Sequence, residues 1–387
     1  MTNQTTVQSS HAGQIVTVPF DSNQNLQLAR EIAAGISAGV ASGRLKSAAS
    51  PDGPPATLPA GKAGVFFQED SGLTFLPAGY DAVVNTTKDA TIFGSGGLNE
   101  SVLSGNGGLT FFATGGSGTV VAGGGNNRII IPATDAGSWL IAPGNGNDTV
   151  LALGPGSDTI RTGDGNSALV LDSGKDLLQL SGHNTVVASG GYDTVDATHA
   201  KSTLIYSGSA HINFVGGAGA ATIVGGTGSE TVLGGSGSLV VHGGADGNNL
   251  LLAGSGRATL YGGGNGDMLF AEGGKPQVLF AGSGNETLSA TLSTGNDTLV
   301  GGSGNATLEG GGGKDTFAFI KGQEGGTDFV INFSDADKID LSGYGTKAVA
   351  KALASQTVSN GSVTITLSDN TKITFSGVSN LTKSDFT

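Results

Sequence analysis

Residues 301–319 read GGSGNATLEGGGGKDTFAF and contain two copies of one nine-residue unit. Each copy opens with glycines and closes with a short apolar segment that follows a Thr. Short segments rich in β-branched and aromatic residues are typical of strands, and glycine supplies the positive φ angles of tight turns. The sixth position is Ala306 in the first copy and Asp315 in the second. The role of this carboxylate is the central question about the repeat.

The same unit organises most of the chain. Roughly 25 short apolar segments recur between Ile92 and Phe317, about nine residues apart. Strands this short bury no face alone and must stack on their neighbours. With two units per coil, the sequence predicts an all-β, right-handed parallel β-roll (a β-solenoid) of about 12 turns. The apolar residue at position eight should point inward, and the Thr at position seven should form outward rows.

The flanks predict three regions. Residues 1–62 hold the strand-like QIVTVPF, an amphipathic helix within 23–43 and a Pro-rich linker over 45–62. The apolar stripe Leu28, Ile32, Ile36 and Val40 indicates that this helix caps the end of the roll or docks another subunit. Residues 63–319 form the glycine-rich solenoid. Residues 320–387 form a C-terminal β cap that ends in a hairpin, because VTITL and KITF alternate around an Asp-Asn turn.

Composition excludes several classes of protein. The chain has 387 residues, 70 of them Gly, no Cys and a formal net charge of −13. An acidic chain lacks the basic face that nucleic acid requires. No apolar run approaches the ~18 residues of a membrane span, so membrane insertion is not expected. The N-terminus has no basic and apolar regions of a standard signal peptide.

Three stretches carry a resemblance to a known family. The residues GNGNDTVLALGPGSDTI (144–160) and TGNDTLVGGSGNATLEGGGGKDTFAF (294–319) resemble hemolysin-type calcium-binding, or RTX, repeat proteins, whose unit is GGxGxDxUx. The tail, FVINFSDADKIDLSGYG (329–345) through LTKSDFT (381–387), resembles the C-terminal region of serralysin-type secreted proteins. This resemblance implies calcium binding, and it implies export by a type I secretion apparatus through an uncleaved C-terminal signal. The protein is then expected to be extracellular, at the cell surface or in a matrix.

In this family calcium lies between turns one coil apart, held by position-six carboxylates and turn carbonyls, which suit a hard cation. One edge gives Asp267, Glu286 and Ala306, and the other gives Pro276, Asp297 and Asp315. Asp297 with Asp315 is the first candidate site, and Asp267 with Glu286 is the second. Asp148 faces Ser167, and Asp158 shares an edge with Asp176 and Asp193. The alternative for each Asp is a hydrogen bond to turn amides without metal. Only a few calcium ions are expected.

No catalytic motif stands out, and we do not expect an enzyme. The five histidines are scattered, and neither HExxH nor a suitable GxSxG elbow is present. The leading hypothesis is a secreted structural protein that self-assembles into filaments, a surface layer (S-layer) or biofilm matrix, with itself as partner. The alternative is a monomeric adhesin that recognises a glycan such as cell-surface polysaccharide, another surface or ice. A secretion carrier that has lost its passenger is a third hypothesis.

Overall fold

A computed structural model describes residues 3–9, 14–20 and 23–387. The chain divides into two compact units, Met1–Thr203 and Leu204–Thr387. Each unit is a β-solenoid with parallel pairing between coils, and about 16 turns are present in all. The sequence predicted about 12 turns. The structure has more turns than predicted because strands outside Ile92–Phe317 also join the parallel ladder. The predicted boundaries at residues 62 and 319 follow composition and stay predictions.

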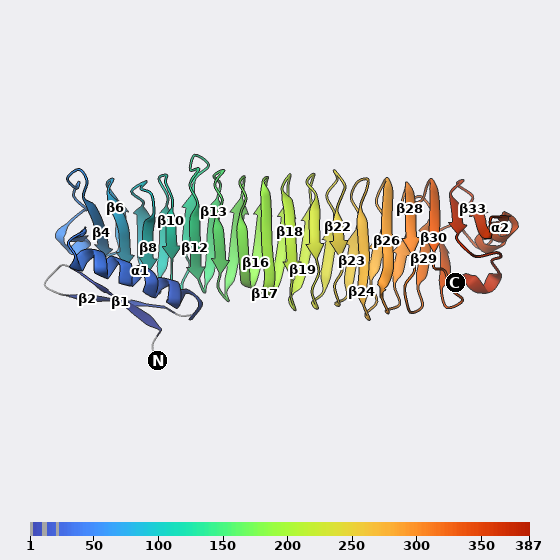
Figure 1. Ribbon diagram of the computed structural model, residues 1–387, viewed down its shortest axis with the longest axis horizontal. Coiled ribbons are helices and arrows are strands. Elements are labelled where there is room, and N and C mark those ends of the chain that lie inside the picture. The colour runs from blue at the N-terminus through green and yellow to red at the C-terminus, as the bar shows by residue number, and fades with distance from the viewer. Residues whose placement is uncertain (1–2, 10–13, 21–22) are drawn as a thin grey trace. The chain divides into compact units, whose positions relative to one another are not determined.

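In the first unit the coils form two stacks of parallel strands (Figure 1). The first stack contains β3 (Leu45–Ala49), β4 (Ala63–Gln68), β6 (Tyr80–Asn85), β8 (Glu100–Ser104), β10 (Gly118–Val121), β12 (Trp139–Gly144) and β14 (Thr159–Thr162). The second stack contains β5 (Gly72–Phe75), β7 (Asp89–Phe93), β9 (Gly108–Phe112), β11 (Arg128–Ile131), β13 (Asn147–Ala152) and β15 (Asn166–Leu171). The long strand β16 (Leu177–Ala188) bends, so that its first part pairs with β14 and its second with β15. Strand β17 (Tyr192–Ser207) follows.

The second unit repeats this plan. Its first stack contains β18 (His211–Gly216), β20 (Glu230–Leu233), β22 (Leu250–Leu252), β24 (Met268–Gly273), β26 (Asn285–Ser293), β28 (Asn305–Glu309) and β30 (Thr327–Ile331). Its second stack contains β19 (Ala220–Gly225), β21 (Leu239–His242), β23 (Ala258–Tyr261), β25 (Val278–Phe280), β27 (Thr298–Val300), β29 (Thr316–Ile320) and β31 (Lys338–Ser342).

The interior of each unit is a column of position-eight side chains, as predicted. All of those singled out by the repeat are fully buried: Val150, Ile160, Val232, Leu260, Leu288, Leu299, Leu308 and Phe317. Thr at position seven lies outward and half-exposed, with Thr287 opposite Thr307 and Thr298 opposite Thr316. Alternation of this kind fixes the register, because a one-residue slip would expose the whole core.

The glycine turns stack backbone on backbone. A Cβ on Gly146 would overlap the carbonyl oxygen of Gly125 in the preceding coil, and one on Gly304 would overlap that of Gly284. Gly146 also has φ 147°, a conformation that other residues rarely adopt. Glycine is therefore required at these turns by close approach of the next coil.

The predicted helix is α1 (Asn23–Ala41), but it lies along the side of the first unit rather than over its end (Figure 1). Its buried face consists of Leu26, Ala29, Ala33 and Ile36, whereas the expected Leu28, Ile32 and Val40 are only partly buried. The alanines let the helix approach an outward apolar column of the first stack: Phe67, Val84, Leu103, Val121 and Ala142. Asn25 Nδ2 donates to the carbonyls of Ala122 (3.1 Å) and Ala142 (3.2 Å).

Two N-terminal predictions change. QIVTVPF contains β2 (Ile15–Pro19), as expected for a strand, but β2 already pairs antiparallel with β1 (Gln4–Gln8). Part of the expected linker is strand β3, because Leu45 and Ala49 are buried against α1 and β3 pairs with β4. The 3-10 turn η1 (Ser50–Asp52) follows. No helix among the described residues is long and apolar enough to cross a membrane.

The C-terminal cap forms at the end of the second unit. It consists of α2 (Ala348–Ala354), β32 (Thr357–Ser359), β33 (Ser362–Thr366), β34 (Lys372–Phe375) and the 3-10 turn η2 (Lys383–Asp385). Strands β33 and β34 make the expected antiparallel hairpin, with Asn370 at φ 73° in its turn. Strand β34 also pairs with β30, and the last residues cover β31 through the Ile339–Phe386 bridge.

The packing of α1 gives a first prediction. Leu103→Ala should cost about 2–5 kcal/mol, because it leaves a cavity beneath the helix. Hydrogen exchange should show faster exchange of the α1 amides. The control is Leu233→Ala, which shortens a side chain that is 41% exposed in the second unit. Equal protection of α1 in both variants would contradict the assigned helix interface.

Candidate metal centre

Position six forms a hydrogen-bond ladder between successive coils, which is interrupted at Glu286 and Ala306. In each case a side-chain oxygen accepts the backbone N–H of the position-six residue in the preceding coil, at 2.8–3.1 Å. In the first unit the acceptors are Asn127, Asp148, Asp158, Asp176 and Asp193. In the second unit they are Asn249, Asp267, Asp297, Asp315, Asp328 and Asp337. The side-chain oxygen at position six therefore joins adjacent coils by a direct hydrogen bond.

Asp297 and Asp315 lie in consecutive coils, as the repeat predicted. Asp315 Oδ1 accepts the N–H of Asp297 (2.9 Å), and its Oδ2 accepts the N–H of Gly311 (2.9 Å). Asp297 Oδ1 accepts the N–H of Gln277 (2.8 Å), while its buried Oδ2 has no hydrogen-bond partner among the described residues. One orphaned carboxylate oxygen thus lies beside the turns, and the position-six neighbour is Gln277, not Pro276 as expected.

Asp267 and Glu286 also lie in neighbouring coils, since Met268 pairs with Thr287. Asp267 is saturated: Oδ1 accepts from the backbone and side-chain amides of Asn249, and Oδ2 accepts from Gly263. Glu286 differs, because it is 2% exposed and neither carboxylate oxygen has a hydrogen-bond partner within the described part of the chain. A buried carboxylate in this state favours either protonation or a cation.

The first-unit candidates lie at the predicted edges. Asp148 is opposite Ser167 and accepts from the backbone (2.9 Å) and side-chain (3.1 Å) amides of Asn127. Asp158 accepts the N–H of Trp139. In turn, Asp176 accepts the N–H of Asp158, and Asp193 accepts the N–H of Asp176.

Burial raises the pKa of most of these acids. Desolvation raises the pKa of Asp158 to about 6 and that of Asp176 to about 7. It also raises the pKa of Glu286 to about 7, with repulsion from Asp267 and then Asp328 adding to the effect. The pKa values of Asp297 and Asp315 rise for the same reason, burial. A bound cation would reverse this effect by stabilising the charged form.

Some turns hold an amide group where the repeat would otherwise offer carbonyls to a cation. Gln277 Nε2 lies 2.7–2.9 Å from the carbonyl oxygens of Gly254, Gly256 and Glu272. Asn127 Nδ2 faces the carbonyls of Gly123 (3.2 Å) and Pro143 (2.8 Å), and Asn249 Nδ2 faces that of Gly244 (2.9 Å). Because these N–H groups satisfy the turn oxygens, we interpret them as replacing the cation at those turns.

The arrangement therefore divides the coils into two kinds. Within the described ranges no group of three or more His, Asp or Glu side chains is arranged to hold a metal ion. Buried carboxylate oxygens without a hydrogen-bond partner among the described residues belong at position six to Asp176, Asp193, Glu286, Asp297 and Asp328. Of the four second-unit residues predicted as ligands, Glu286 and Asp297 carry such oxygens, with turn carbonyls nearby. Sequence reasoning missed Asn127, Asn249 and Gln277. The sequence signal for these residues was an amide side chain at position six of the repeat. For the last two, counting along the repeat was wrong by one residue and placed Asn248 and Pro276 at position six instead.

Comparison with family models supports this reading of the repeat. Four segments match the RTX calcium-binding nonapeptide repeat: 143–178, 213–238, 243–277 and 291–318. These segments are RTX repeats. They include Asp148, Asp158, Asp267, Asp297 and Asp315 but not Glu286. Two of them, 213–238 and 243–277, lie between the stretches that carried the resemblance in the sequence. No curated protein matches the chain. The serralysin-like resemblance of the tail stays a prediction, because no matched segment reaches residues 319–387.

The raised pKa of Glu286 gives a pH prediction. Its pKa rises from 4.5 to about 7 on folding, so below pH 4.5 its contribution to stability is fully present. That contribution is lost as pH rises towards about 7, because the folded state must then bury a charge. In chelator, Glu286→Gln should show a flatter fall in urea midpoint between pH 5 and pH 8 than the unchanged protein. The matched control, Glu309→Gln, removes a half-exposed carboxylate and should leave the slope unchanged.

The amide at Gln277 gives a second prediction. Gln277→Glu should lower the free energy of unfolding by about 1–3 kcal/mol in chelator, because an oxygen then faces three carbonyl oxygens. Millimolar calcium should restore much of this loss, since the new carboxylate completes an oxygen-rich turn. Gln277→Met removes the amide without adding charge and should not respond to calcium. Equal calcium responses of the two variants would contradict the assigned role of the amide.

Proposed function

We propose that this protein is a secreted structural protein that self-assembles outside the cell into filaments, a surface layer or biofilm matrix. The observation that carries the proposal is the extent of the solenoid. Within each unit parallel pairing takes up nearly all strands, from β3 onward in the first unit and up to β31 in the second, and only the β1–β2 hairpin, α1 and a small cap lie outside it among the described elements. A chain built almost wholly of one stacking unit has rigidity as its main property.

Calcium is proposed at few coils. Asp297 with Asp315, and Glu286 with Asp267, would hold the ion through side-chain oxygens, and turn carbonyls would supply further ligands. A bound ion supplies positive charge that offsets the burial of these carboxylates. Asp148 and Asp158 are the candidates in the first unit, where Asp148 accepts two amide donors from Asn127 and Asp158 continues the backbone ladder.

A structural role is favoured over an enzymatic one by the arrangement of the histidine side chains, the usual general acids and bases. The described histidines lie apart, and His242 stacks on Tyr261 at 4.4 Å. Export by a type I secretion apparatus is proposed from the RTX repeats and from the resemblance of the tail, not from geometry.

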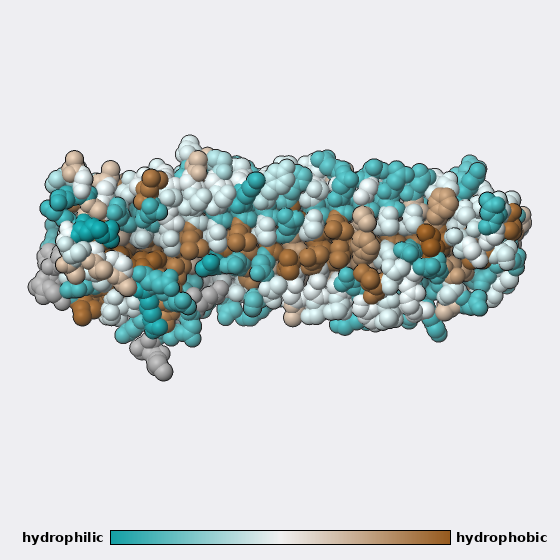
Figure 2. Space-filling view, in the orientation of Figure 1, coloured by the Kyte–Doolittle hydropathy of each residue, from teal (hydrophilic) through white to brown (hydrophobic). Residues whose placement is uncertain are grey.

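A monomeric adhesin is the alternative, and the aromatic ladders are the observation that bears on it. His242, Tyr261 and Phe280 stack at 4.4–4.5 Å, as do Phe75, Phe93 and Phe112 at 4.6 Å. Because each ring covers the face of the next, inner rings offer mainly edges to a sugar. Ice binding is disfavoured too, since Val240, Met268 and Val278 interrupt the Thr rows. Figure 2 shows hydrophobic side chains gathered in a band across the strands of the second unit.

The test is assembly with and without calcium. Negative-stain microscopy and sedimentation should show polymers of the calcium-refolded protein and their loss or weakening in chelator. Asp297→Asn is the informative variant, because its amide oxygen can keep the bond from Gln277 while the charge is removed. It should stay folded but lose most of the calcium response. Monodisperse protein under all conditions, retained on polysaccharide, would favour the adhesin.

A further inference from the structure

The first unit ends in an unpaired strand edge. Among the described residues, β5 pairs with β7 alone. The Leu76 N–H donates to the carbonyl oxygen of Phe93 in β7. Because the backbone N–H and C=O groups of alternate residues in a strand point to the same side, those of Thr74 also face β7. The N–H and C=O groups of Leu73 and Phe75 are therefore directed to the open side. Both side chains are also exposed, at 59% and 61%.

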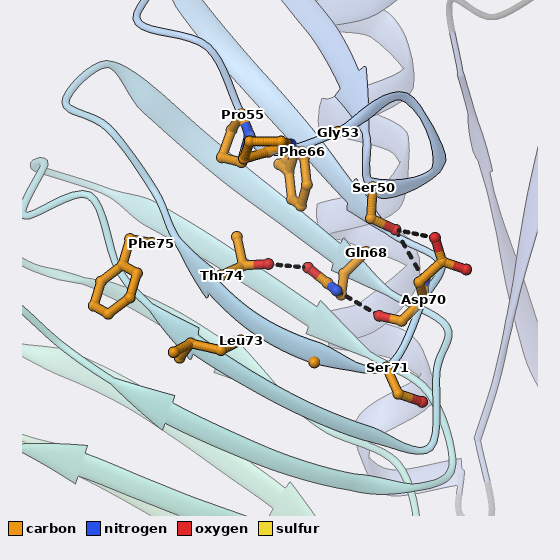
Figure 3. A pocket seen from close by; sticks show the side chains of 12 residues that line it. Ser50, Gly53, Pro55, Phe66, Gln68, Asp70, Ser71, Leu73, Thr74 and Phe75 are labelled. Carbon is orange, nitrogen blue, oxygen red and sulfur yellow. Dashed lines mark hydrogen bonds between the residues drawn. The ribbon is translucent and has the colours of Figure 1, made fainter.

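A groove of about 420 Å³ runs beside this edge (Figure 3). One wall is β5 with Leu73, Thr74 and Phe75, and the other is the segment from Ser50 to Pro55. Hydrogen bonds hold both sides of the groove: in its buried floor Thr74 Oγ1 donates to Gln68 Oε1 (2.6 Å), and at its exposed side Ser50 Oγ accepts the N–H groups of Glu69 and Asp70 (2.9 Å each). An open edge beside a preformed groove is the geometry that accepts an added strand.

The second unit carries a matching edge. Strand β32 pairs only with β33 among the described strands, and all three of its residues are exposed, with Val358 at 59%. The two-residue turn Asn360–Gly361 makes Ser359 and Ser362 a hydrogen-bonded pair, so Val358 directs its N–H and C=O away from β33. The neighbouring edge of β31 is covered by the C-terminal residues.

Charge favours pairing of these two edges. Residues 50–92, around β5, carry five acidic and two basic side chains, and Glu69 and Asp70 are exposed beside the groove. Residues 343–387, around β32, carry four lysines and two aspartates, a basic segment in an acidic chain. Opposite charge at two exposed edges guides association and disfavours pairing of like with like.

We propose that strand β32 of one copy adds to the open edge of β5 in a second copy. The contact is heterologous, because each copy offers one edge of each kind, and it continues from copy to copy unless a ring closes. This inference rests on the proposed self-assembly and assigns it a specific contact.

The first experiment uses the absence of native cysteine. Leu73→Cys protein and Val358→Cys protein are mixed and treated with a short bismaleimide. The control mixture replaces the first partner by Leu98→Cys, at a side chain that is 76% exposed. Cross-linked dimers of the 73–358 pair should exceed those of the 98–358 pair by at least about tenfold, because pairing raises the local concentration of the two thiols. Equal yields would overturn the proposal.

A second variant tests the backbone contact. Val358→Pro removes the outward N–H but leaves the bonded pairs of β33 intact, and Val358→Thr keeps that N–H. The Pro variant should need a roughly tenfold higher concentration to sediment, whereas the Thr variant should behave as the unchanged protein. Hydrogen exchange of β33 confirms that the cap is folded in both.

The outcomes separate the two proposals. If the unchanged protein polymerises but neither the cross-link nor the Pro variant shows an effect, this contact is wrong and self-assembly stands. If the 73–358 cross-link is specific but no polymer forms, the contact stands and the filament role falls. If neither polymer nor specific cross-link is found, both proposals are overturned.

Discussion

Close approach of successive glycine turns is the constraint on which this structure depends. At turns such as Gly146 and Gly304 the backbone of one coil occupies the space that a Cβ of the next would need. This approach sets the coil spacing, brings the short strands within hydrogen-bonding distance and packs the position-eight side chains into a column within each unit. It also brings position six of one coil beside the N–H of position six in the preceding coil, which makes the side-chain ladder possible.

The ladder explains why the repeat tolerates different residues at position six. The bond between coils needs only an acceptor oxygen, which Asp and Asn both supply. Where the residue has an amide, as at Gln277 and Asn249, its N–H groups also satisfy turn carbonyls. Where it is a carboxylate, an oxygen can be left over, as at Asp297 and Glu286. A need for cations is therefore a local property of single coils. Ala306 has no acceptor side chain, but its backbone N–H still donates to Asp328 and so joins its coil to the next one.

Much of this fold could be predicted from sequence, because period and glycine placement report directly on stacking. The inward column, the parallel pairing, the final hairpin and the neighbourhood of Asp297 and Asp315 all follow from the nine-residue period. The position of α1 could not be predicted in this way. The stripe that contains Leu28 and Ile32 is more apolar than the alanine-rich face that the helix buries, so the sequence pattern indicated the wrong face. The amides at Asn249 and Gln277 were missed because neighbouring turns differ in length, which shifts the count by one residue.

The amide of Gln277 and the carboxylate of Glu286 have nearly the same shape, and they occupy position six in consecutive repeats. An exchange of nitrogen for oxygen at such a position changes what fills the turn without moving the backbone. A single substitution between Gln and Glu is therefore expected to exchange an amide-filled turn for a charged one in one coil and to leave the other coils unchanged.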